Sequence, residues 1–212
     1  MVRQFVAFTF GTAALVASAA TAMPPASEWE IGPWARGKNY SVNMPATPAP
    51  GANGSLVVDF PRAGRGEWDA LTTGVYPLDG FERVTVRYRI DAAPGTRFVA
   101  VEDPNTAPTI SLYFQRARDN WTARGKYASY RWYAPRHTLM PITPGEHTIS
   151  IRFDDRWTNV AHRPNTEHSR AYEAALARAA RFGFAFGTPL LRSHGVAATG
   201  EARFTLLSVE FE

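Results

Sequence analysis

Apolar and polar residues alternate along much of the chain from residue 55 onward. In one stretch, Val84, Val86, Tyr88 and Ile90 share one side of an extended chain, and Arg and Thr side chains occupy the other. A period of two predicts antiparallel strands with one buried and one solvent-facing side. Similar alternation recurs in residues 56–60, 110–114, 149–153, 182–186 and 203–211.

Three local features complete the predicted architecture. Near the start, EWEIGPW (residues 28–34) indicates an edge strand that ends at a Gly-Pro break. In residues 203–211 the alternation changes phase at Leu206-Leu207, which predicts a β-bulge that keeps both apolar sets inward. Only near residues 167–181 does the apolar spacing fit a helix, with Tyr172 and Leu176 on its stripe. The predicted fold class is therefore all-β: a two-sheet antiparallel β-sandwich of the jelly-roll type with one short helix.

The first residues predict export. Residues 1–22 carry Arg3 as their only charge, then an apolar run, then the small residues Ala20-Thr21-Ala22. This is the order of a secretory signal peptide cleaved after Ala22, which leaves residues 23–212 as a single β-sandwich domain in the periplasm or outside the cell. The alternative is a membrane anchor, but the apolar run is short and rich in Ala, Ser and Thr. We therefore expect no integral membrane span.

Composition narrows the chemistry. The chain has no Cys, which excludes disulfides, thiolate nucleophiles and Cys-ligated zinc. Its formal net charge is +4 at pH 7 and is carried mainly by Arg. That charge is too small and too scattered to predict nucleic-acid binding, but it is compatible with an acidic glycan as partner.

The densest cluster of candidate ligand-binding residues is Asn120 to Tyr133, NWTARGKYASYRWY. Aromatic rings beside cationic groups suit stacking on a sugar while the charges fix its orientation. The alternative is that these rings belong to the core of the sandwich. The candidate ligand-binding residues, with Trp157 as a rim candidate, are Trp121, Arg124, Tyr127, Tyr130, Arg131 and Trp157.

Strand alternation also predicts which side chains share a face. It places Tyr130 and Trp132 on one side, and Arg131 and Tyr133 on the other. In residues 110–115 it turns Tyr113 and Gln115 outward. If the strand at residues 83–90 lay beside this one, the shared outer face would present Tyr, Gln and Arg to an acidic or hydroxyl-rich ligand. The alternative is a solvated outer sheet in which Arg serves solubility.

No catalytic motif stands out. The chain lacks G-x-S-x-G, and Ser193-His194-Gly195 is interpreted as a polar turn. Glycoside hydrolysis needs two carboxylates across a cleft. Candidates on strand segments are Glu28, Glu30, Glu67, Asp69, Glu102 and Asp154, and none of them forms the E-x-D-x-x-E pattern of jelly-roll hydrolases.

Metal signals are equally sparse. No H-E-x-x-H or EF-hand loop is present, and no cofactor is expected. Glu102-Asp103 and Asp154-Asp155 are adjacent acidic pairs at strand ends, where a structural calcium ion would find carboxylate ligands. The alternative is that these carboxylates cap backbone amides in turns.

The C-terminal forty residues carry a family resemblance. The helix ending at Arg181 leads into the strand FGFAFG (182–187), then the turn SHGVAATG (193–200), then the strand ARFTLLSVEF (202–211). This order resembles the closing segment of galactose-binding-like jelly rolls, the architecture of many carbohydrate-binding modules. The resemblance implies sugar binding, and it assigns no ligand residue because ligand positions vary in those modules.

Together these features predict an exported, non-catalytic carbohydrate-binding protein, with acidic polysaccharides among its expected ligands. One alternative is a small glycan hydrolase or polysaccharide lyase on a jelly-roll fold, which would show carboxylates or a Tyr/His/Arg cluster converging in a groove. Another is a structural cell-envelope protein that binds a protein partner through a flat apolar patch. The sequence carries no signal for the oligomeric state.

Overall fold

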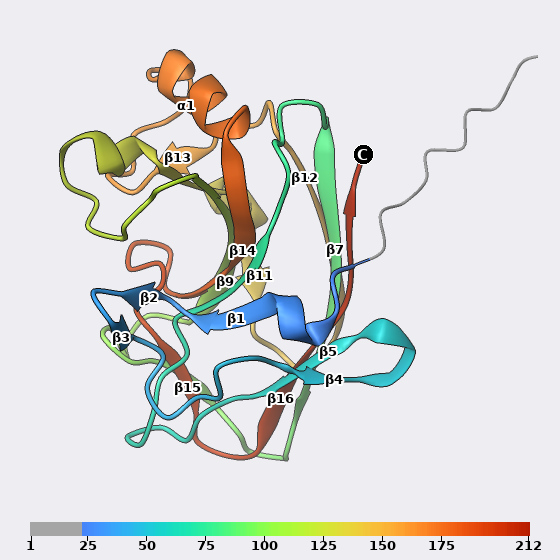
Figure 1. Ribbon diagram of the computed structural model, residues 1–212. Helices are drawn as coiled ribbons and strands as arrows, with labels where there is room; N and C mark the ends of the chain where they lie inside the picture. The colour runs from blue at the N-terminus through green and yellow to red at the C-terminus, as the bar shows by residue number, and fades with distance from the viewer. Residues whose placement is uncertain (1–22) are drawn as a thin grey trace, which may run out of the picture.

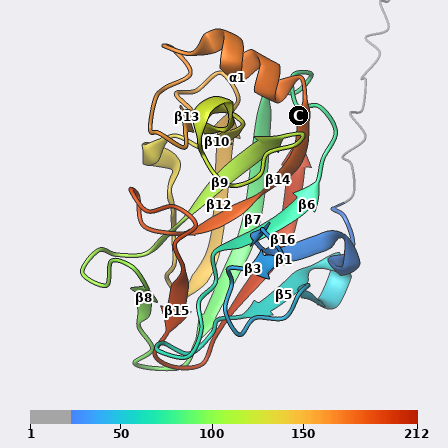
Figure 2. The same ribbon diagram turned by 60° about the vertical axis from the view of Figure 1, so that its left-hand side comes forward.

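A computed structural model describes residues 23–212, which form two antiparallel β-sheets with a hydrophobic core between them (Figures 1 and 2). Every pairing between the named strands is antiparallel. The all-β sandwich class predicted from alternation is confirmed. The predicted signal peptide, residues 1–22, lies outside the described residues.

The first sheet has seven strands in the order β1-β6-β14-β9-β10-β13, and β11 also pairs with β9. As predicted for EWEIGPW, β1 lies at the end of the sheet and stops at Gly32. The strand bounds, in chain order, are Trp29–Gly32 (β1), Ala70–Gly74 (β6), Thr109–Arg116 (β9), Arg131–Tyr133 (β10), Met140–Pro141 (β11), Thr158–Asn159 (β13) and Ala179–Gly187 (β14).

The second sheet has five strands in the order β12-β7-β16-β5-β4. Its register shifts between Leu206 and Ser208, so the predicted bulge is confirmed. The bulge keeps Phe204, Leu206 and Val209 in the core, but Leu207 lies on the outer face, so the prediction that both apolar sets turn inward is wrong for Leu207. The bounds are Ala49–Pro50 (β4), Leu56–Asp59 (β5), Arg83–Ala92 (β7), Gly145–Arg152 (β12) and Ala202–Phe211 (β16).

Short elements connect the sheets. Two further strand pairs join β2 (Trp34–Ala35) to β3 (Lys38–Asn39), and β8 (Phe98–Ala100) to β15 (Val196–Ala198). The helix α1 (Ser169–Leu176) lies across one end of the sandwich (Figure 2). Four single turns of 3-10 helix occur at Ala26–Glu28, Ala52–Gly54, Gly125–Ser129 and Arg136–Thr138.

The core is rich in aromatic residues. Trp29, Trp68, Trp132 and Trp157 are each at most 1% exposed. The Trp68 ring stacks on Phe186 with a centroid separation of 3.7 Å. Each large ring removes much apolar surface from water, which stabilises a sandwich that has no disulfide.

The helix is shorter than its sequence pattern predicts. It ends at Leu176, and β14 already begins at Ala179, inside the predicted range of residues 167–181. Ala179 pairs with Arg116 and Arg181 with Gln115. Sheet pairing thus overrides the helical propensity of this Ala-rich segment, because it satisfies backbone groups between two neighbouring strands.

The strand with the outward arginines does not lie beside the strand with Tyr113. The arginines belong to β7 in the five-stranded sheet, whereas Tyr113 belongs to β9 in the seven-stranded sheet. The outer face of β9 is also not solvated, because Ser111, Tyr113 and Gln115 are at most 2% exposed. The predicted outer face shared by residues 83–90 and residues 110–115 is therefore wrong. Alternation predicts which face of a strand a side chain occupies, but it does not predict which strands are neighbours.

Among residues 23–212, the structure contains no helix with the length and apolar character that a membrane span requires.

Trp157 lies in the core rather than at a rim. It is fully buried, stacks on Phe153 at 5.7 Å and meets Phe114 edge-on at 5.4 Å. Its indole N–H donates to the carbonyl oxygen of Arg152 at 2.9 Å. The ring therefore has no surface to offer a ligand.

We expect Trp157→Ala to lower the free energy of unfolding by about 3–5 kcal/mol, because it leaves a large cavity between packed rings. Trp34→Ala is the matched control, since that ring is 48% exposed, and we expect it to change stability by less than about 1 kcal/mol. Urea unfolding followed by circular dichroism measures both. Equal effects of the two substitutions would contradict this placement.

Candidate functional site

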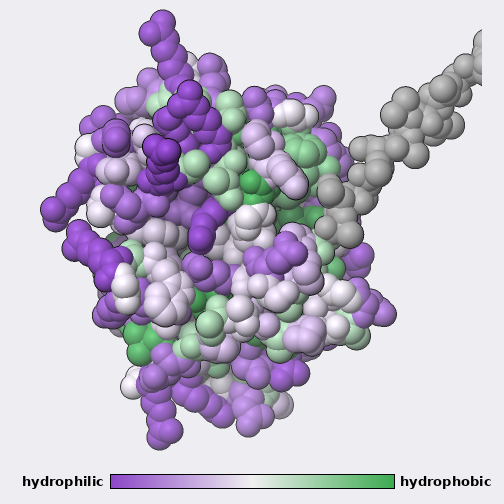
Figure 3. Space-filling model, in the orientation of Figure 1, coloured by the Kyte–Doolittle hydropathy of each residue, from purple (hydrophilic) through white to green (hydrophobic). Residues whose placement is uncertain are grey.

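A hollow of about 430 Å³ opens on the face of the seven-stranded sheet that points away from the core. We call it the groove. Strand β10 contributes Arg131 and Tyr133 to it, whereas Trp132 between them is in the core. Around this face lie the β2–β3 hairpin, the β9–β10 loop and the β14–β15 loop, on the left-hand side of Figure 1. In the same orientation, Figure 3 shows many hydrophilic side chains on this side. The remaining lining residues come from residues 33–40, 67–69, 120–124 and 192–194, with Glu102 and Val160.

The floor of the groove is a second, smaller apolar cluster. It contains Ala70, Tyr113, Tyr133 and Ala185, and Trp121 packs against it. Trp121 meets Tyr113 edge-on at 5.8 Å. Burial raises the pKa of the Tyr113 hydroxyl, which therefore stays neutral and hydrogen-bonds to Thr72. This sheet is thus covered on both faces, and the groove has a rigid base.

Arg131 is held flat in this base. Its guanidinium lies over the Trp121 ring at 3.8 Å and is 3% exposed. Asp119 forms an ion pair with it at 3.5 Å, and Asp119 also accepts a hydrogen bond from Gln115 at 2.7 Å. Nη1 is the atom in this ion pair, but neither it nor Nε has a partner within hydrogen-bond distance among residues 23–212. Buried donors without hydrogen bonds are costly, which marks Arg131 as a candidate for contact with a ligand.

A second arginine is arranged in the same way. The Arg192 guanidinium lies over Tyr133 at 4.8 Å, and its Nη1 donates to Thr158 at 2.9 Å. Burial lowers the pKa of Arg192, and its Nε has no hydrogen-bond partner in the described part of the chain. Arg36 and Arg124 line the rim, are exposed, and take part in no ion pair among residues 23–212. One side of the groove is therefore cationic.

Carboxyl groups also line the groove. Glu67 and Asp69 flank Trp68, so alternation turns both carboxyl groups to the groove while Trp68 enters the core. Glu102 also lines the groove, and its Oε2 accepts a hydrogen bond from the Nδ1–H of His194 at 2.9 Å. The groove therefore combines three carboxyl groups with four arginines in one hollow.

Asp69 is the most perturbed of these groups. It is 5% exposed, and its Oδ1 has no hydrogen-bond partner among the described residues. Burial, reinforced by the charges of Glu67 and Glu102, raises the pKa of Asp69 to about 8. Burial also raises the pKa of Glu67, followed by the charge of Glu102, while Lys38 and His194 oppose that rise. At neutral pH Asp69 is therefore mainly protonated.

The candidate ligand-binding residues separate into three groups. Trp121, Arg124 and Arg131 line the groove. Tyr127 and Tyr130 do not line it; they pack edge-on against each other at 5.2 Å in the turn Gly125–Ser129. Lys126 lies over Tyr127, and Arg116 over Tyr130 at 4.5 Å. Trp157 is in the core, as described above.

The candidate metal ligands are not gathered around a common point. Within residues 23–212, no three His, Cys, Asp or Glu residues are arranged to hold a metal ion. Asp154 forms an ion pair with Arg152 at 2.8 Å, and Asp155 accepts from the Arg152 backbone N–H at 3.1 Å. Asp103 accepts a backbone hydrogen bond from Thr106 in a turn. Glu102 lies apart from the Asp154-Asp155 pair and belongs to the groove.

The sequence analysis did not predict that several of the groove residues lie together in one site. Glu67, Asp69 and Glu102 appeared only as three of six strand carboxylates, and His194 only as a turn residue. Arg36, Tyr40 and Arg192 carried no signal at all. The one available clue was the spacing of Glu67 and Asp69 around a large apolar residue, which predicts that they share an outward face.

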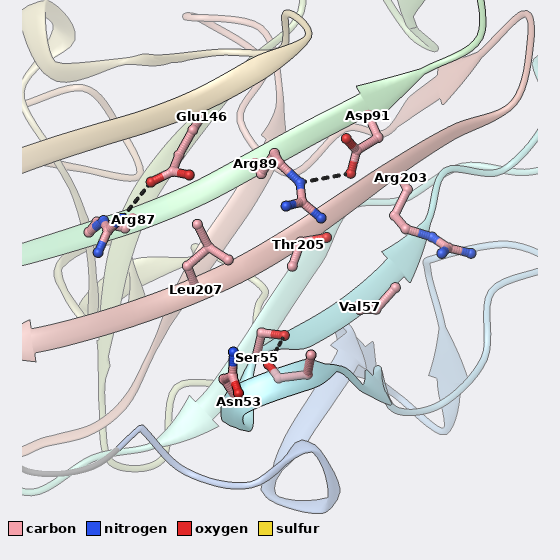
Figure 4. Close-up of a pocket in the computed structure, with 11 residues that line it drawn as sticks. Asn53, Ser55, Val57, Arg87, Arg89, Asp91, Glu146, Arg203, Thr205 and Leu207 are labelled. Carbon is pink, nitrogen blue, oxygen red and sulfur yellow. Dashed lines mark hydrogen bonds and ion pairs between the residues drawn. The ribbon is translucent and has the colours of Figure 1, made fainter.

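A second hollow, of about 450 Å³, lies on the outer face of the five-stranded sheet (Figure 4). Its arginines are already paired. Arg87 bonds to Glu146 at 2.5 Å and Arg89 to Asp91 at 3.0 Å, as the dashed lines show. Arg203 bonds to Asp59 at 2.7 Å. The arginines of this surface are exposed and form ion pairs with neighbouring carboxylates, and none of them has a buried N–H group without a hydrogen-bond partner among residues 23–212. They therefore serve as controls for the arginines of the groove.

The raised pKa of Asp69 predicts a pH-dependent stability. A carboxyl group whose pKa is higher in the folded than in the unfolded state stabilises the fold below the unfolded pKa, and this stabilisation is lost as pH rises toward the folded pKa. With a pKa of about 8 against 3.8, wild-type stability should fall relative to Asp69→Asn by on the order of 3 kcal/mol between pH 5 and pH 8. Urea unfolding of both proteins across this range measures the difference. Parallel curves would show that Asp69 ionises normally.

Comparison with known proteins finds no matching family model and no matching curated protein. Similar solved structures include a carbohydrate-binding module, CBM28, specific for non-crystalline cellulose (15% identity, TM-score 0.42, 87% of each chain). They also include Xylanase10C of Cellvibrio japonicus in complex with xylopentaose (12% identity, TM-score 0.40, 89% of this chain and 29% of that one). A third belongs to work on endo-acting O-glycanases that human gut microbiota express to initiate mucin breakdown (10% identity, TM-score 0.39, 91% and 95%). The first is of the class that the C-terminal segment resembles.

Proposed function

We propose that this protein binds an acidic carbohydrate in the groove. The observation that carries the proposal is the pair of arginines that lie over aromatic rings, Arg131 over Trp121 and Arg192 over Tyr133, each with an Nε–H that lacks a hydrogen-bond partner among residues 23–212. Preorganised donors of this kind suit carboxylate, sulfate or hydroxyl oxygens of a ligand. The volume of about 430 Å³ lies within the usual range of small-ligand sites.

The distribution of charge supports an acidic ligand. Arg36 and Arg124 at the rim have no ion-pair partner among residues 23–212, unlike the paired arginines on the other sheet. An acidic sugar would supply their counter-charge. Asn120 and Thr122 line the same side and supply side-chain groups for neutral hydroxyls.

The shape of the surface favours a carbohydrate over a protein partner. A structural envelope role would call for a flat apolar patch. Among the described residues, Tyr76, Val101 and Leu190 are exposed in three separate segments, and Trp34, Tyr40 and Val42 are exposed on or beside the β2–β3 hairpin. The predicted export of the chain and the resemblance of its C-terminal segment to carbohydrate-binding modules point to the same class of ligand.

We expect Arg124→Ala to weaken binding of polygalacturonate oligosaccharides about 3- to 10-fold at low salt, and less at high salt, because an exposed charge contact is screened. Arg87→Ala is the matched control, since Arg87 is exposed to a similar degree but already bonds to Glu146. Isothermal titration calorimetry at two salt concentrations measures both variants. An equal loss from both would indicate only a general charge effect.

Trp121→Ala should weaken binding of the same ligand by about tenfold, because Arg131 loses the ring that holds it flat. Tyr127→Ala serves as control, since Tyr127 lies in the neighbouring turn but does not line the groove. Calorimetry of both variants, after thermal melting shows that they are folded, tests the assignment. Unchanged affinity in folded Trp121→Ala would remove that ring from the site.

A further inference from the structure

The acidic side of the groove has a geometry that binding alone does not require. Glu67 Oε2 and Asp69 Oδ1 lie 3.0 and 3.1 Å from the position that a Cβ atom on Gly195 would occupy. The two carboxyl oxygens are therefore no more than about 6 Å apart. Gly195 lets its backbone approach both carboxyl groups closely, because a side chain there would clash with Glu67 and Asp69. Two carboxyl groups this close, in a hollow with unpaired arginines, form an asymmetric pair rather than a solvated acidic patch.

The backbone holds Asp69 in place while its carboxyl group stays without a partner. The Asp69 backbone N–H donates to Ser41 Oγ at 2.9 Å, and its carbonyl oxygen accepts from the Phe186 backbone N–H at 2.8 Å. The side chain is 95% buried, with Oδ1 lacking any hydrogen-bond partner within residues 23–212. A rigid, buried and unsatisfied carboxyl group that lines a cavity is a group positioned for something that enters the cavity.

We propose that the groove also hydrolyses the carbohydrate that it binds, with Asp69 as the general acid and Glu67 as the nucleophile. The inference rests on the proposed binding function and extends it from recognition to cleavage of a glycosidic bond in an acidic polysaccharide.

The environments of the two groups assign their roles. Asp69 is the more buried and keeps its proton at neutral pH, because burial and the charges of Glu67 and Glu102 raise its pKa to about 8. Glu67 is less buried, and Lys38 and His194 counteract the burial and the Glu102 charge that raise its pKa. Neighbouring carboxyl groups whose pKa values are pushed apart are a recurrent acid and nucleophile arrangement.

The reaction balances with these two residues and water. Asp69 donates its proton to the glycosidic oxygen as the bond from that oxygen to C1 breaks, and a Glu67 carboxylate oxygen forms a bond to C1. Water then attacks C1, the ester bond to Glu67 breaks, and the Asp69 carboxylate takes the proton from the water. The products are a free hydroxyl on the leaving sugar and a hemiacetal. Both side chains return to their starting protonation states.

The separation of the carboxyl groups predicts the stereochemical outcome. Retaining glycosidases hold their two carboxyl groups about 5–5.5 Å apart, whereas inverting enzymes need about 6.5–9.5 Å to admit a water molecule. An upper limit of about 6 Å here favours retention of configuration at C1. Turnover should also decline as pH rises through about 8, where Asp69 loses its proton.

The test measures binding and product release separately on residues 23–212. The probes are polygalacturonate, hyaluronate and dermatan sulfate, with xylan and swollen cellulose as neutral polymers. We expect binding by affinity electrophoresis and release of reducing ends from at least one acidic polymer. Asp69→Asn and Glu67→Gln should each lower release at least about 100-fold and leave binding within about threefold. Glu146→Gln, on the outer face of the other sheet, should change neither.

The outcomes distinguish the two proposals. Binding of an acidic polymer without any released product would overturn hydrolysis and leave the binding function standing. If none of the polymers binds, both the binding proposal and the hydrolysis proposal are overturned. Products that absorb in the ultraviolet as unsaturated uronates would indicate elimination and contradict hydrolysis. In the Glu67→Ala variant, azide should restore turnover and yield a glycosyl azide. If the first product of the wild-type protein has the inverted configuration at C1, Glu67 is not the nucleophile.

Discussion

The alternation of side chains along β-strands is the constraint on which both faces of the seven-stranded sheet depend. Trp68 and Trp132 enter the core between the sheets and are fully buried there. Their neighbours must therefore point outward: Glu67 and Asp69 around one, Arg131 and Tyr133 around the other. The packing of the core thereby fixes which side chains reach the groove. In β10, a shift of one residue would exchange Trp132 with Arg131 or Tyr133.

The outward face of this sheet is itself partly apolar, and that explains why a groove forms there. Tyr113 and Tyr133 need cover from water, and the Trp121 loop supplies it from one side. Arg131 and Arg192 then lie on aromatic rings and not in solvent. On the outer face of the five-stranded sheet, arginines are exposed and pair with carboxylates (Figure 4). The same residue type thus lies over aromatic rings on one sheet and pairs with carboxylates at the exposed surface of the other.

Local patterns predicted the elements well, while the site required contacts between distant segments. The strands, the bulge after Leu206 and the outward position of Arg131 follow from alternation alone. The C-terminal end of the helix does not, because pairing of Ala179 in β14 depends on β9. Nor does the contact of His194 with Glu102, since residues on β14–β15 and β8–β9 connections meet only after the sheets have formed. The burial of Trp157 could not be predicted either, because the residues around a tryptophan near a strand end do not show whether its ring lies in the core or at the rim of a site.

The central claim is that one groove on the seven-stranded sheet brings the arginines and the carboxyl pair onto a single carbohydrate. A crystal structure of Asp69→Asn with an acidic oligosaccharide tests it most directly. We expect a sugar ring beside Trp121 and Tyr133, an acidic substituent within hydrogen-bond distance of Arg131 or Arg192, and a glycosidic oxygen next to residue 69. An oligosaccharide bound instead on the outer face of the five-stranded sheet, with the groove left open, would contradict it.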